Sequence, residues 1–157
     1  MSEEALQELV VAVHPWFREG ETYQPFKIWA PEKRIVLGSY LENLNVFLRN
    51  NPNVILLEHP DSCEKSKQRV LELTSREPRI IETNGRGWEN SLDWDSLAKI
   101  AGQKPKLVGG YVLESKFYPY DPKGFDFVGC LGIVHGQLAA RGLRPEFVSD
   151  CCYTWPE

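Results

Sequence analysis

Two runs of consecutive apolar residues constrain the fold of this chain more than any other feature. Residues 8–14 read ELVVAVH and residues 53–59 read NVILLEH, and each run ends in a histidine that is followed by a proline. An unbroken apolar run, without alternating polar residues, is typical of a strand that is buried on both faces of a parallel sheet. The two runs therefore predict inner strands of such a sheet.

Further strands and helices alternate along the rest of the chain. Four helices are predicted from capping residues, from apolar periodicity and from the glycine after Arg141. The predicted strands are RIIET (79–83), KLVGGYVL (106–113) and PEFVSD (145–150), with an additional strand around Arg34–Leu37. The first predicted helix follows the capping residues Ser39 and Glu42, and the second follows Asp61 and Glu64. The third covers DWDSLAKIAG and ends at Gly102. The fourth runs from about Phe125 to Arg141, with Gly142 as the stop.

Strands separated by helices predict a single α/β domain over residues 1–157. We expect a three-layer Rossmann-like fold with a five- or six-stranded, mainly parallel sheet of order 3-2-1-4-5, joined by right-handed crossovers. Ligands bind such sheets beyond the carboxyl ends of the strands, where the strand order reverses. Here that crevice lies between the first and fourth strands, and we expect His14, the segment after Tyr111 and Cys130 to line it.

Charge and cysteine usage narrow the class of partner. The net charge is −4 and no run of Lys or Arg occurs, so nucleic acid and anionic membranes are not expected partners. No apolar stretch approaches the roughly 18 residues that a membrane span requires, and the acidic start is unlike a secretory signal. Four cysteines, two of them adjacent, suit a reducing compartment. We therefore predict a cytoplasmic protein that takes a small-molecule substrate or ligand and no cofactor.

Cys130 is the candidate nucleophile. It lies near the start of the fourth predicted helix, where the helix dipole lowers the pKa of a thiol and favours the reactive thiolate. The alternative is that Cys130 is a small buried apolar residue, since Leu131, Ile133 and Val134 around it resemble core.

His14 and His59 are the candidate partners of the thiol. Both close apolar strands, so both should emerge at the carboxyl edge of the sheet, where His14 could act as general base. Alternatively, each imidazole forms a hydrogen bond with the loop backbone at the point where its strand ends. Two histidines with a cysteine or aspartate could also bind zinc, but no ligands stand at a typical zinc spacing, so we predict no metal. Structural roles are expected for His135 and Asp150.

The segment ESKFYPYDPKGFDF (114–127) is a long insert between the fourth strand and Cys130. Loops of this length at the carboxyl edge of a sheet are commonly lids or binding loops. We therefore take Lys116, Tyr118, Tyr120 and Lys123 as candidate substrate contacts. The alternative is an aromatic patch that packs against a second subunit in a homodimer. TNGRGWENS (83–91) also follows a strand end; it lacks a G-x-G-x-x-G motif, and Asn84 in it is a further candidate contact.

From Cys130 onward the sequence CLGIVHGQLAARGLRPEFVSD resembles the isochorismatase-like cysteine hydrolases. The shared layout is a cysteine at the start of the helix after the fourth strand, an Arg-Gly helix end (Arg141-Gly142) and a hydrophobic strand that closes in an aspartate (Asp150). LVVAVHPWF resembles the family's first strand, and RIIETNGRGWENSLDWDSLAKIAG its third strand and following helix. The resemblance is strongest over residues 127–150 and implies a Cys130 nucleophile.

The chain departs from that family at two of its three catalytic positions. His14 stands where the family has an aspartate at the end of the first strand, and Thr83 stands at or near the position of the family's lysine. The insert before Cys130 is also longer than the family's short turn. Two hypotheses follow: a hydrolase with a divergent active site that uses Cys130 and His14, or a catalytically inactive relative that binds a ligand or a protein.

Overall fold

The computed structural model describes residues 9–16, 23–26, 30–83, 88–110, 112–114 and 125–152. Its centre is a five-stranded sheet in which every neighbouring pair is parallel. The order is β5-β4-β1-β6-β9, which confirms the predicted order 3-2-1-4-5. The strands are β1 (Val10–Val13), β4 (Val54–Glu58), β5 (Arg79–Glu82), β6 (Lys106–Gly109) and β9 (Glu146–Cys152).

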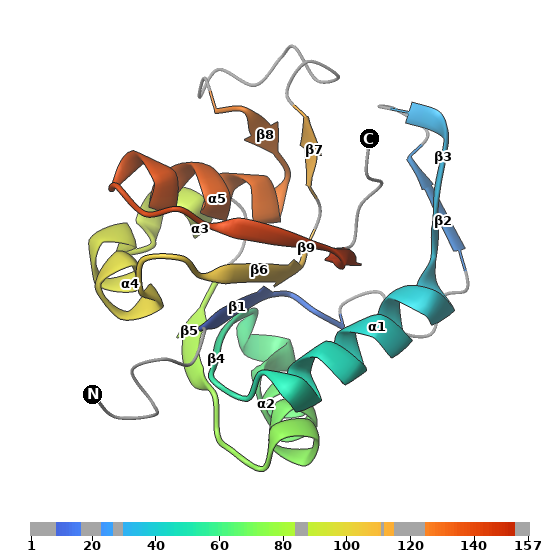
Figure 1. The fold of residues 1–157 in the computed structure, drawn as a ribbon, viewed down its shortest axis with the longest axis horizontal. Coiled ribbons are helices and arrows are strands. Elements are labelled where there is room, and N and C mark those ends of the chain that lie inside the picture. Colours follow the sequence, from blue (N-terminus) through green and yellow to red (C-terminus); the bar gives the residue numbers. More distant parts are fainter. Residues whose placement is uncertain are drawn as a thin grey trace.

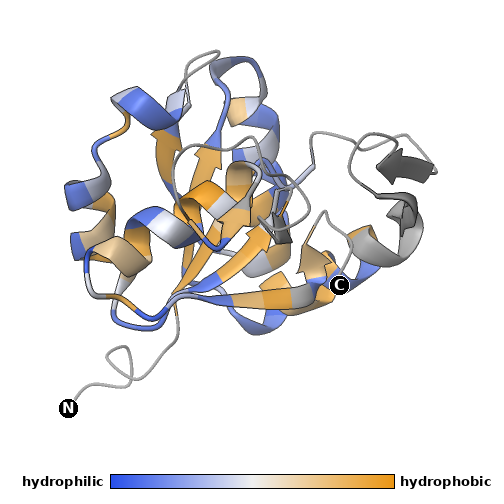
Figure 2. Ribbon diagram, turned by 90° about the horizontal axis from the view of Figure 1, so that it is seen from above, coloured by the Kyte–Doolittle hydropathy of each residue, from blue (hydrophilic) through white to orange (hydrophobic). Residues whose placement is uncertain are grey.

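Helices cover both faces of the sheet and produce the three predicted layers (Figure 1). On one face lie α1 (Leu37–Asn50) and α2 (Pro60–Thr74). On the other lie α3 (Trp88–Ser91), α4 (Trp94–Ala101) and α5 (Cys130–Ala140). Figure 2 shows hydrophobic strands in the middle and hydrophilic residues on the outer sides of the helices. The order of the strands reverses between β1 and β6, so the edge beyond these two strands is the switch point.

Burial explains the unalternated apolar runs. All four residues of β1 and all five of β4 are buried, and the apolar residues of both strands belong alternately to two hydrophobic clusters, one on each face of the sheet. We call them the α1/α2 cluster and the α4/α5 cluster. The edge strand β5 is only partly buried. An inner strand of a parallel sheet has no polar face, so every side chain of β1 must be apolar until the strand ends at His14.

In the described part of the chain, two pairs of antiparallel strands lie outside the main sheet. The first, of β2 (Tyr23–Phe26) and β3 (Ala30–Val36), falls in the region where the sequence predicted a strand around Arg34–Leu37. The second pairs β7 (Leu113–Glu114) with β8 (Phe127–Val128) and closes the base of the long insert. The predicted residues of that insert, Lys116, Tyr118, Tyr120 and Lys123, lie outside the described part of the chain, as does Asn84.

Several predicted element bounds were wrong. Helix α5 begins at Cys130 and not near Phe125, because Phe127 and Val128 pair with β7 and Gly129, at φ 92°, breaks the chain direction. Strand β6 ends at Gly109, whose φ of 90° turns the backbone out of the sheet. Helix α1 begins at Leu37, two residues before the expected cap. Strand β9 continues past Asp150 to Cys152, so the aspartate does not end it.

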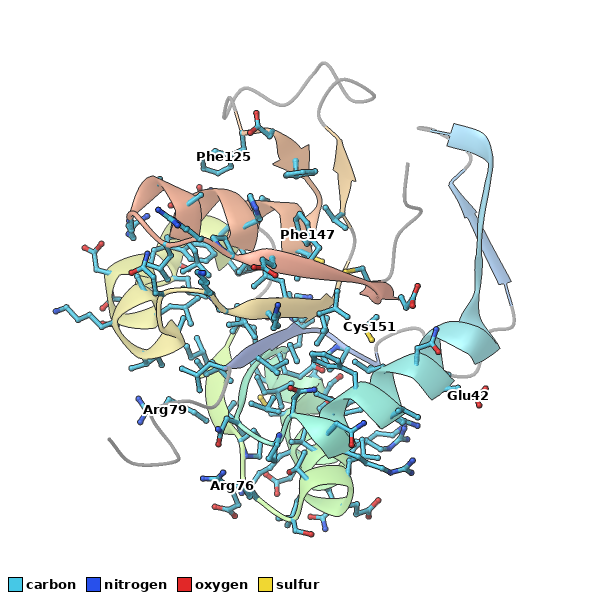
Figure 3. The ribbon with its side chains drawn as sticks, in the orientation of Figure 1. Glu42, Arg76, Arg79, Phe125, Phe147 and Cys151 are labelled. Carbon is cyan, nitrogen blue, oxygen red and sulfur yellow. The ribbon has the colours of Figure 1, made fainter. Side chains whose placement is uncertain are left out.

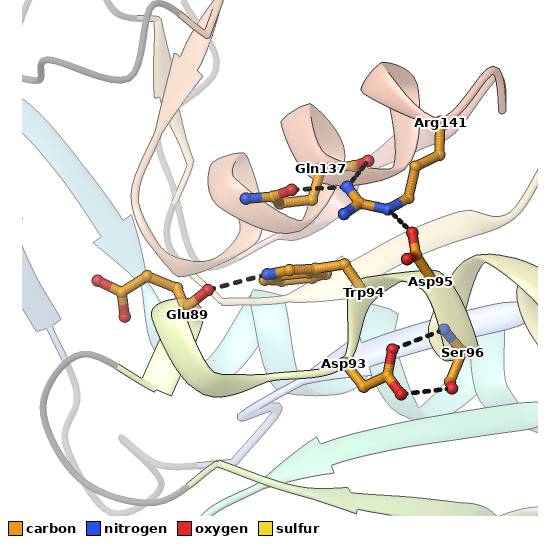
Figure 4. A network of polar contacts seen from close by, with 7 residues as sticks. All are labelled: Glu89, Asp93, Trp94, Asp95, Ser96, Gln137 and Arg141. Atoms are coloured by element: carbon orange, nitrogen blue, oxygen red, sulfur yellow. Dashed lines mark hydrogen bonds and ion pairs between the residues drawn. The ribbon is translucent and has the colours of Figure 1, made fainter.

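A polar network fixes the far end of α5 (Figure 4). The Arg141 guanidinium donates to Asp95 of α4 over 2.6 Å and to both the backbone and the side chain of Gln137. These groups are exposed, so the network adds little to the free energy of unfolding and serves mainly to orient the end of α5 against α4. At the start of α4, the Asp93 side chain accepts from the Ser96 amide, which is the expected N-cap arrangement.

Two glycines of α5 allow the insert's C-terminal base to pack directly on the helix. A Cβ at Gly136 would lie 2.4 Å from the Phe125 ring, and a Cβ at Gly132 would lie 2.8 Å from the Phe127 backbone. Phe127 also packs edge-on against Phe147 of β9. A side chain at either glycine would push residues 125–128 away from α5. The two glycines therefore allow this end of the insert to pack against the helix.

Among the residues that the structure describes, no helix has the length and hydropathy needed to cross a bilayer.

We predict that Gly136→Ala destabilises the protein by about 1–3 kcal/mol through overpacking against Phe125. An ordinary Gly→Ala change inside a helix stabilises by up to about 1 kcal/mol, so the expected sign is reversed here. The measurement is urea unfolding of the two proteins. The control is the same change in a Phe125→Ala background, where the clash is gone and alanine should be neutral or favourable. Equal effects in both backgrounds would contradict the packing.

Candidate functional site

Parallel pairing brings the carboxyl ends of five strands to one edge of the sheet. The residues at these ends are His14 after β1, His59 after β4, Thr83 after β5, Gly110 after β6 and Cys152 in β9. Cys130 begins the helix that starts over the same edge. The predicted gathering of His14 and Cys130 at the β1/β6 end of the sheet is therefore found, although the two are placed by different contacts.

Cys130 is positioned by Gly110. A Cβ at residue 110 would lie 2.8 Å from the Cys130 sulfur and 3.1 Å from Leu131 Cβ, so the thiol rests directly against this glycine. The Gly110 amide in turn donates to the Val13 carbonyl over 2.7 Å. Gly110, the residue after β6, therefore contacts both the Cys130 sulfur and Val13, the residue before His14. Cys130 itself is half-buried, as the first residue of an eleven-residue helix.

His14 is held in an uncommon backbone conformation. Its φ is 44°, in the left-handed region that non-glycine residues rarely adopt. Its amide still donates to the Leu57 carbonyl of β4, which fixes the turn at the end of β1. Such conformations cost on the order of 1–3 kcal/mol and cluster at functional sites, where the surrounding structure maintains them.

The His14 side chain is buried in a polar cluster. Its Nε2 lies 2.8 Å from Thr83 Oγ1, and its ring stacks on His59 at 4.6 Å between centroids and an interplanar angle of 4°. Trp88 packs edge-on against the same ring. His59 Nδ1 lies 2.9 Å from the Thr83 carbonyl, so this nitrogen carries the proton and donates. Thr83 therefore holds both histidines.

Burial and, to a smaller extent, the neighbouring His59 lower the pKa of His14 to about 4. The ring is consequently neutral at physiological pH. A neutral imidazole can accept a proton at one nitrogen only, and Nε2 is already engaged by Thr83. Any exchange with a thiol would therefore use Nδ1, with the proton on Nε2 donated to the threonine oxygen.

The stacked geometry argues against a shared metal ion on the two histidines. A metal bound by an imidazole lies in the plane of the ring. The planes of His14 and His59 are stacked and differ by 4°, so one ion cannot lie in both. Within the described ranges, no group of three or more His, Cys, Asp or Glu side chains has a metal-binding arrangement.

Glu58 is a buried acid that the sequence analysis did not single out. It is 1% exposed, accepts from the Ser66 hydroxyl over 2.7 Å and from the His59 amide over 3.0 Å, and ends β4 two residues before α2 begins. The only sequence signal was its position directly before His59 at a strand end.

The remaining thiols at this edge differ in their surroundings. Burial raises the pKa of Cys63, and the carboxylates of Glu82, Glu58 and Glu64 raise it further. Burial also raises the pKa of Cys152, and that of Cys151 to about 11. In contrast, no acidic residue occurs in the first turn of α5, where Cys130 lies.

One surface cavity lies at the opposite, amino-terminal edge of the sheet. Its volume is about 430 Å³, and its polar lining includes Asn53, Arg76, Glu77 and Arg79. Figure 3 shows Arg76 and Arg79 far from Cys151, which lies near the end of β9. The last turn of α2 adjoins this edge and presents the negative end of its dipole, which disfavours anions. The cavity is therefore separate from the polar cluster.

No protein-family model, curated protein or solved structure matches this chain.

The low pKa of His14 predicts a specific loss of stability in acid. Between pH 6.5 and about 4 the unfolded chain binds a proton on His14 that the folded protein does not, so the free energy of unfolding falls as the pH falls. The full effect is about 3 kcal/mol. We expect His14→Gln to remove most of this dependence, as measured by urea unfolding across that pH range.

His135 sets the baseline for this experiment. Burial lowers its pKa too, so it contributes a smaller dependence of the same sign that persists in the His14 variant. The readout is the slope of stability against pH and not the stability at pH 7, which the substitution also changes. A slope equal to that of the original protein would contradict the burial of a neutral His14.

Proposed function

We propose that this protein is a cysteine-dependent hydrolase of a small molecule, in which Cys130 attacks an amide, imide or related carbon centre. The observation that carries this proposal is the position of Cys130 as the first residue of α5, at the switch point between β1 and β6, with its sulfur against Gly110. A thiol at a helix N-terminus is favoured as thiolate. The resemblance to the isochorismatase-like hydrolases points to the same residue.

The start of α5 also supplies hydrogen-bond donors. The Ile133 amide donates to the Gly129 carbonyl and closes the first turn of α5, and the first amides of a helix have no partner within the helix. Donors of this kind stabilise the oxyanion that forms when a thiolate attacks a carbonyl carbon. In this proposal the nucleophile and the oxyanion donors come from the same helical turn.

His14 is the proposed base, through Nδ1. Its low pKa excludes a stable imidazolium that would pair with a resting thiolate. Its role is therefore confined to accepting the thiol proton as the attack proceeds, while Thr83 holds the ring in the required tautomer. His14 and Thr83 occupy the positions of the aspartate and lysine in the resembled family, so this activation would differ from that of the family.

The insert supplies the proposed substrate contacts. The β7–β8 pairing and the packing of Phe125 and Phe127 on α5 bring its base beside the start of that helix. The proposed substrate contacts remain Lys116, Tyr118, Tyr120 and Lys123, together with Asn84. A small-molecule substrate agrees with the net charge of −4, and the four thiols agree with a reducing compartment such as the cytoplasm.

The second candidate is a non-catalytic ligand-binding protein. The burial of His14 and its low pKa favour this alternative, because proton transfer from an ordinary thiol to so weak a base is uphill by several kcal/mol. In this case the polar cluster of His14, His59 and Thr83 would stabilise the sheet edge, and the insert would bind a ligand without turnover.

Selective alkylation tests the state of the Cys130 thiol. We predict that iodoacetamide modifies Cys130 at least about tenfold faster than Cys63 at pH 7, since the reactive fraction changes about tenfold for each unit of pKa. Cys63 is a matched internal control, because it also lies in the first turn of a helix at this edge but faces carboxylates. Peptide mapping of partly alkylated protein gives both rates. A Cys130 rate no higher than that of Cys63 would argue against a nucleophile.

Hydrolysis of a panel of small amides and cyclic imides tests the function itself. We expect Cys130→Ala to abolish substrate loss, measured by mass spectrometry, and His14→Asn to lower its rate roughly a hundredfold through loss of general base catalysis. Asparagine tolerates the positive φ of residue 14. Cys63→Ala serves as the control and should retain the rate. Hydrolysis that survives in Cys130→Ala would overturn the proposal. A compound that raises the Tm without being hydrolysed would favour the ligand-binding alternative.

A further inference from the structure

Two of the four cysteines adjoin consecutive glycines at the end of β6. In the β6–β9 pairing, Cys152 is the register partner of Gly109. The Cys130 sulfur lies against the next residue, Gly110, where a Cβ would be 2.8 Å from it. The last residue of β6, Gly109, therefore pairs with Cys152, and the residue that follows it, Gly110, lies against the Cys130 sulfur.

The two thiols also share one face of the sheet. Cys152 belongs to the α4/α5 cluster and Cys130 packs against that cluster, while Cys151 belongs to the α1/α2 cluster on the opposite face. Figure 3 shows Cys151 on the side of β9 that faces α1. Adjacent strand residues point to opposite faces, so only Cys152 can reach Cys130.

We propose that Cys130 and Cys152 form a redox pair, in which a hydroperoxide oxidises Cys130 and Cys152 then closes a disulfide with it. The inference rests on the placement of the two sulfurs and not on the proposed hydrolase activity. If Cys130 is also the nucleophile of a hydrolase, the disulfide would block it reversibly.

The chemistry balances in two steps. The Cys130 thiolate attacks the terminal peroxide oxygen, an S–O bond forms as the O–O bond breaks, and the sulfur loses two electrons to the peroxide, which leaves as hydroxide or alkoxide and takes up a proton. Cys152 then attacks the sulfur of the sulfenic acid. An S–S bond forms, the S–O bond breaks, and the hydroxyl group leaves as water with the thiol proton.

The surroundings assign these roles to the two residues. Cys130 is half-buried at a helix N-terminus, which favours the thiolate that reacts with peroxide. Cys152 is 4% exposed, and its thiol lies 3.2 Å from the Val148 carbonyl, so it does not meet oxidant from solvent. The register of β9 shifts between its pairings with Leu107 and Gly109, so the strand is irregular just before Cys152. Disulfide geometry therefore does not have to be reached against a continuous ladder of hydrogen bonds.

The test is peptide mapping without reduction after treatment of the intact chain with hydrogen peroxide. We expect a disulfide that links the tryptic peptide of residues 124–141 to that of residues 142–157, with fragmentation assigning Cys152 as the partner. Cys151→Ala is the matched control and should keep the link. Cys152→Ala should lose it, and trapping of the Cys130 sulfenic acid by dimedone should rise roughly tenfold because no thiol resolves it.

Three results would overturn the inference. They are a link assigned to Cys151 or Cys63, a link that persists in Cys152→Ala, and oxidation of Cys130 to sulfinic acid in the original protein with no link formed. Fragmentation of the original protein's linked peptide decides the assignment even if a variant fails to fold. None of these measurements uses hydrolysis, so failure of the redox pair and failure of the proposed function are distinguishable.

Discussion

The hydrogen bond from the Gly110 amide to the Val13 carbonyl joins the ends of β1 and β6 at the point where the order of the strands reverses. The approach is close enough that a Cβ at Gly109 would lie 2.4 Å from that carbonyl oxygen. Glycine is therefore required there both for space and for its φ of 90°. The same contact ends β6, directs the chain toward the insert, and leaves Gly110 facing the Cys130 sulfur. The site depends on these two strand ends staying together.

The electrostatic environment changes along this edge of the sheet. Beyond β4 and β5 it is acidic, with Glu58 and Glu82 at the strand ends and Glu64 in α2. Beyond β6 the first turn of α5 carries no acid, and the helix dipole is positive there. The two halves therefore have opposite effects on a thiolate, destabilising it at Cys63 and favouring it at Cys130. The stacked rings of His14 and His59 lie between the halves, and His14 is neutral at physiological pH.

Apolar patterning was sufficient to predict the architecture. The runs before His14 and His59 must be inner strands of a parallel sheet because both of their faces are buried, and right-handed crossovers then leave few orders for five strands. Element ends were less predictable, because they depend on tertiary contacts. Phe127 and Val128 continue an apolar pattern toward α5 and read as helix, but pairing with β7 makes them a strand. Cys151 and Cys152 prolong β9 because its register shifts against β6.

The contacts of the histidines could not be deduced from strand ends alone. Position at the carboxyl edge follows from parallel pairing, and the sequence placed His14, His59 and Thr83 there. Whether their side chains meet depends on the left-handed turn at His14 and on the register that sets Glu58 opposite Glu82, which brings Thr83 level with His59. Trp88, which follows Thr83 on α3, then closes the cluster.

The polar cluster of His14, His59 and Thr83 limits the chemistry that His14 can perform at this edge of the sheet. A ring that is neutral at any pH above about 4 keeps one tautomer and one hydrogen-bond pattern throughout the physiological range. It cannot create a resting thiolate by charge, since that requires an imidazolium. In the proposed hydrolase, the first turn of α5 would therefore favour the Cys130 thiolate, and His14, held by Thr83, would accept a proton only as the attack proceeds.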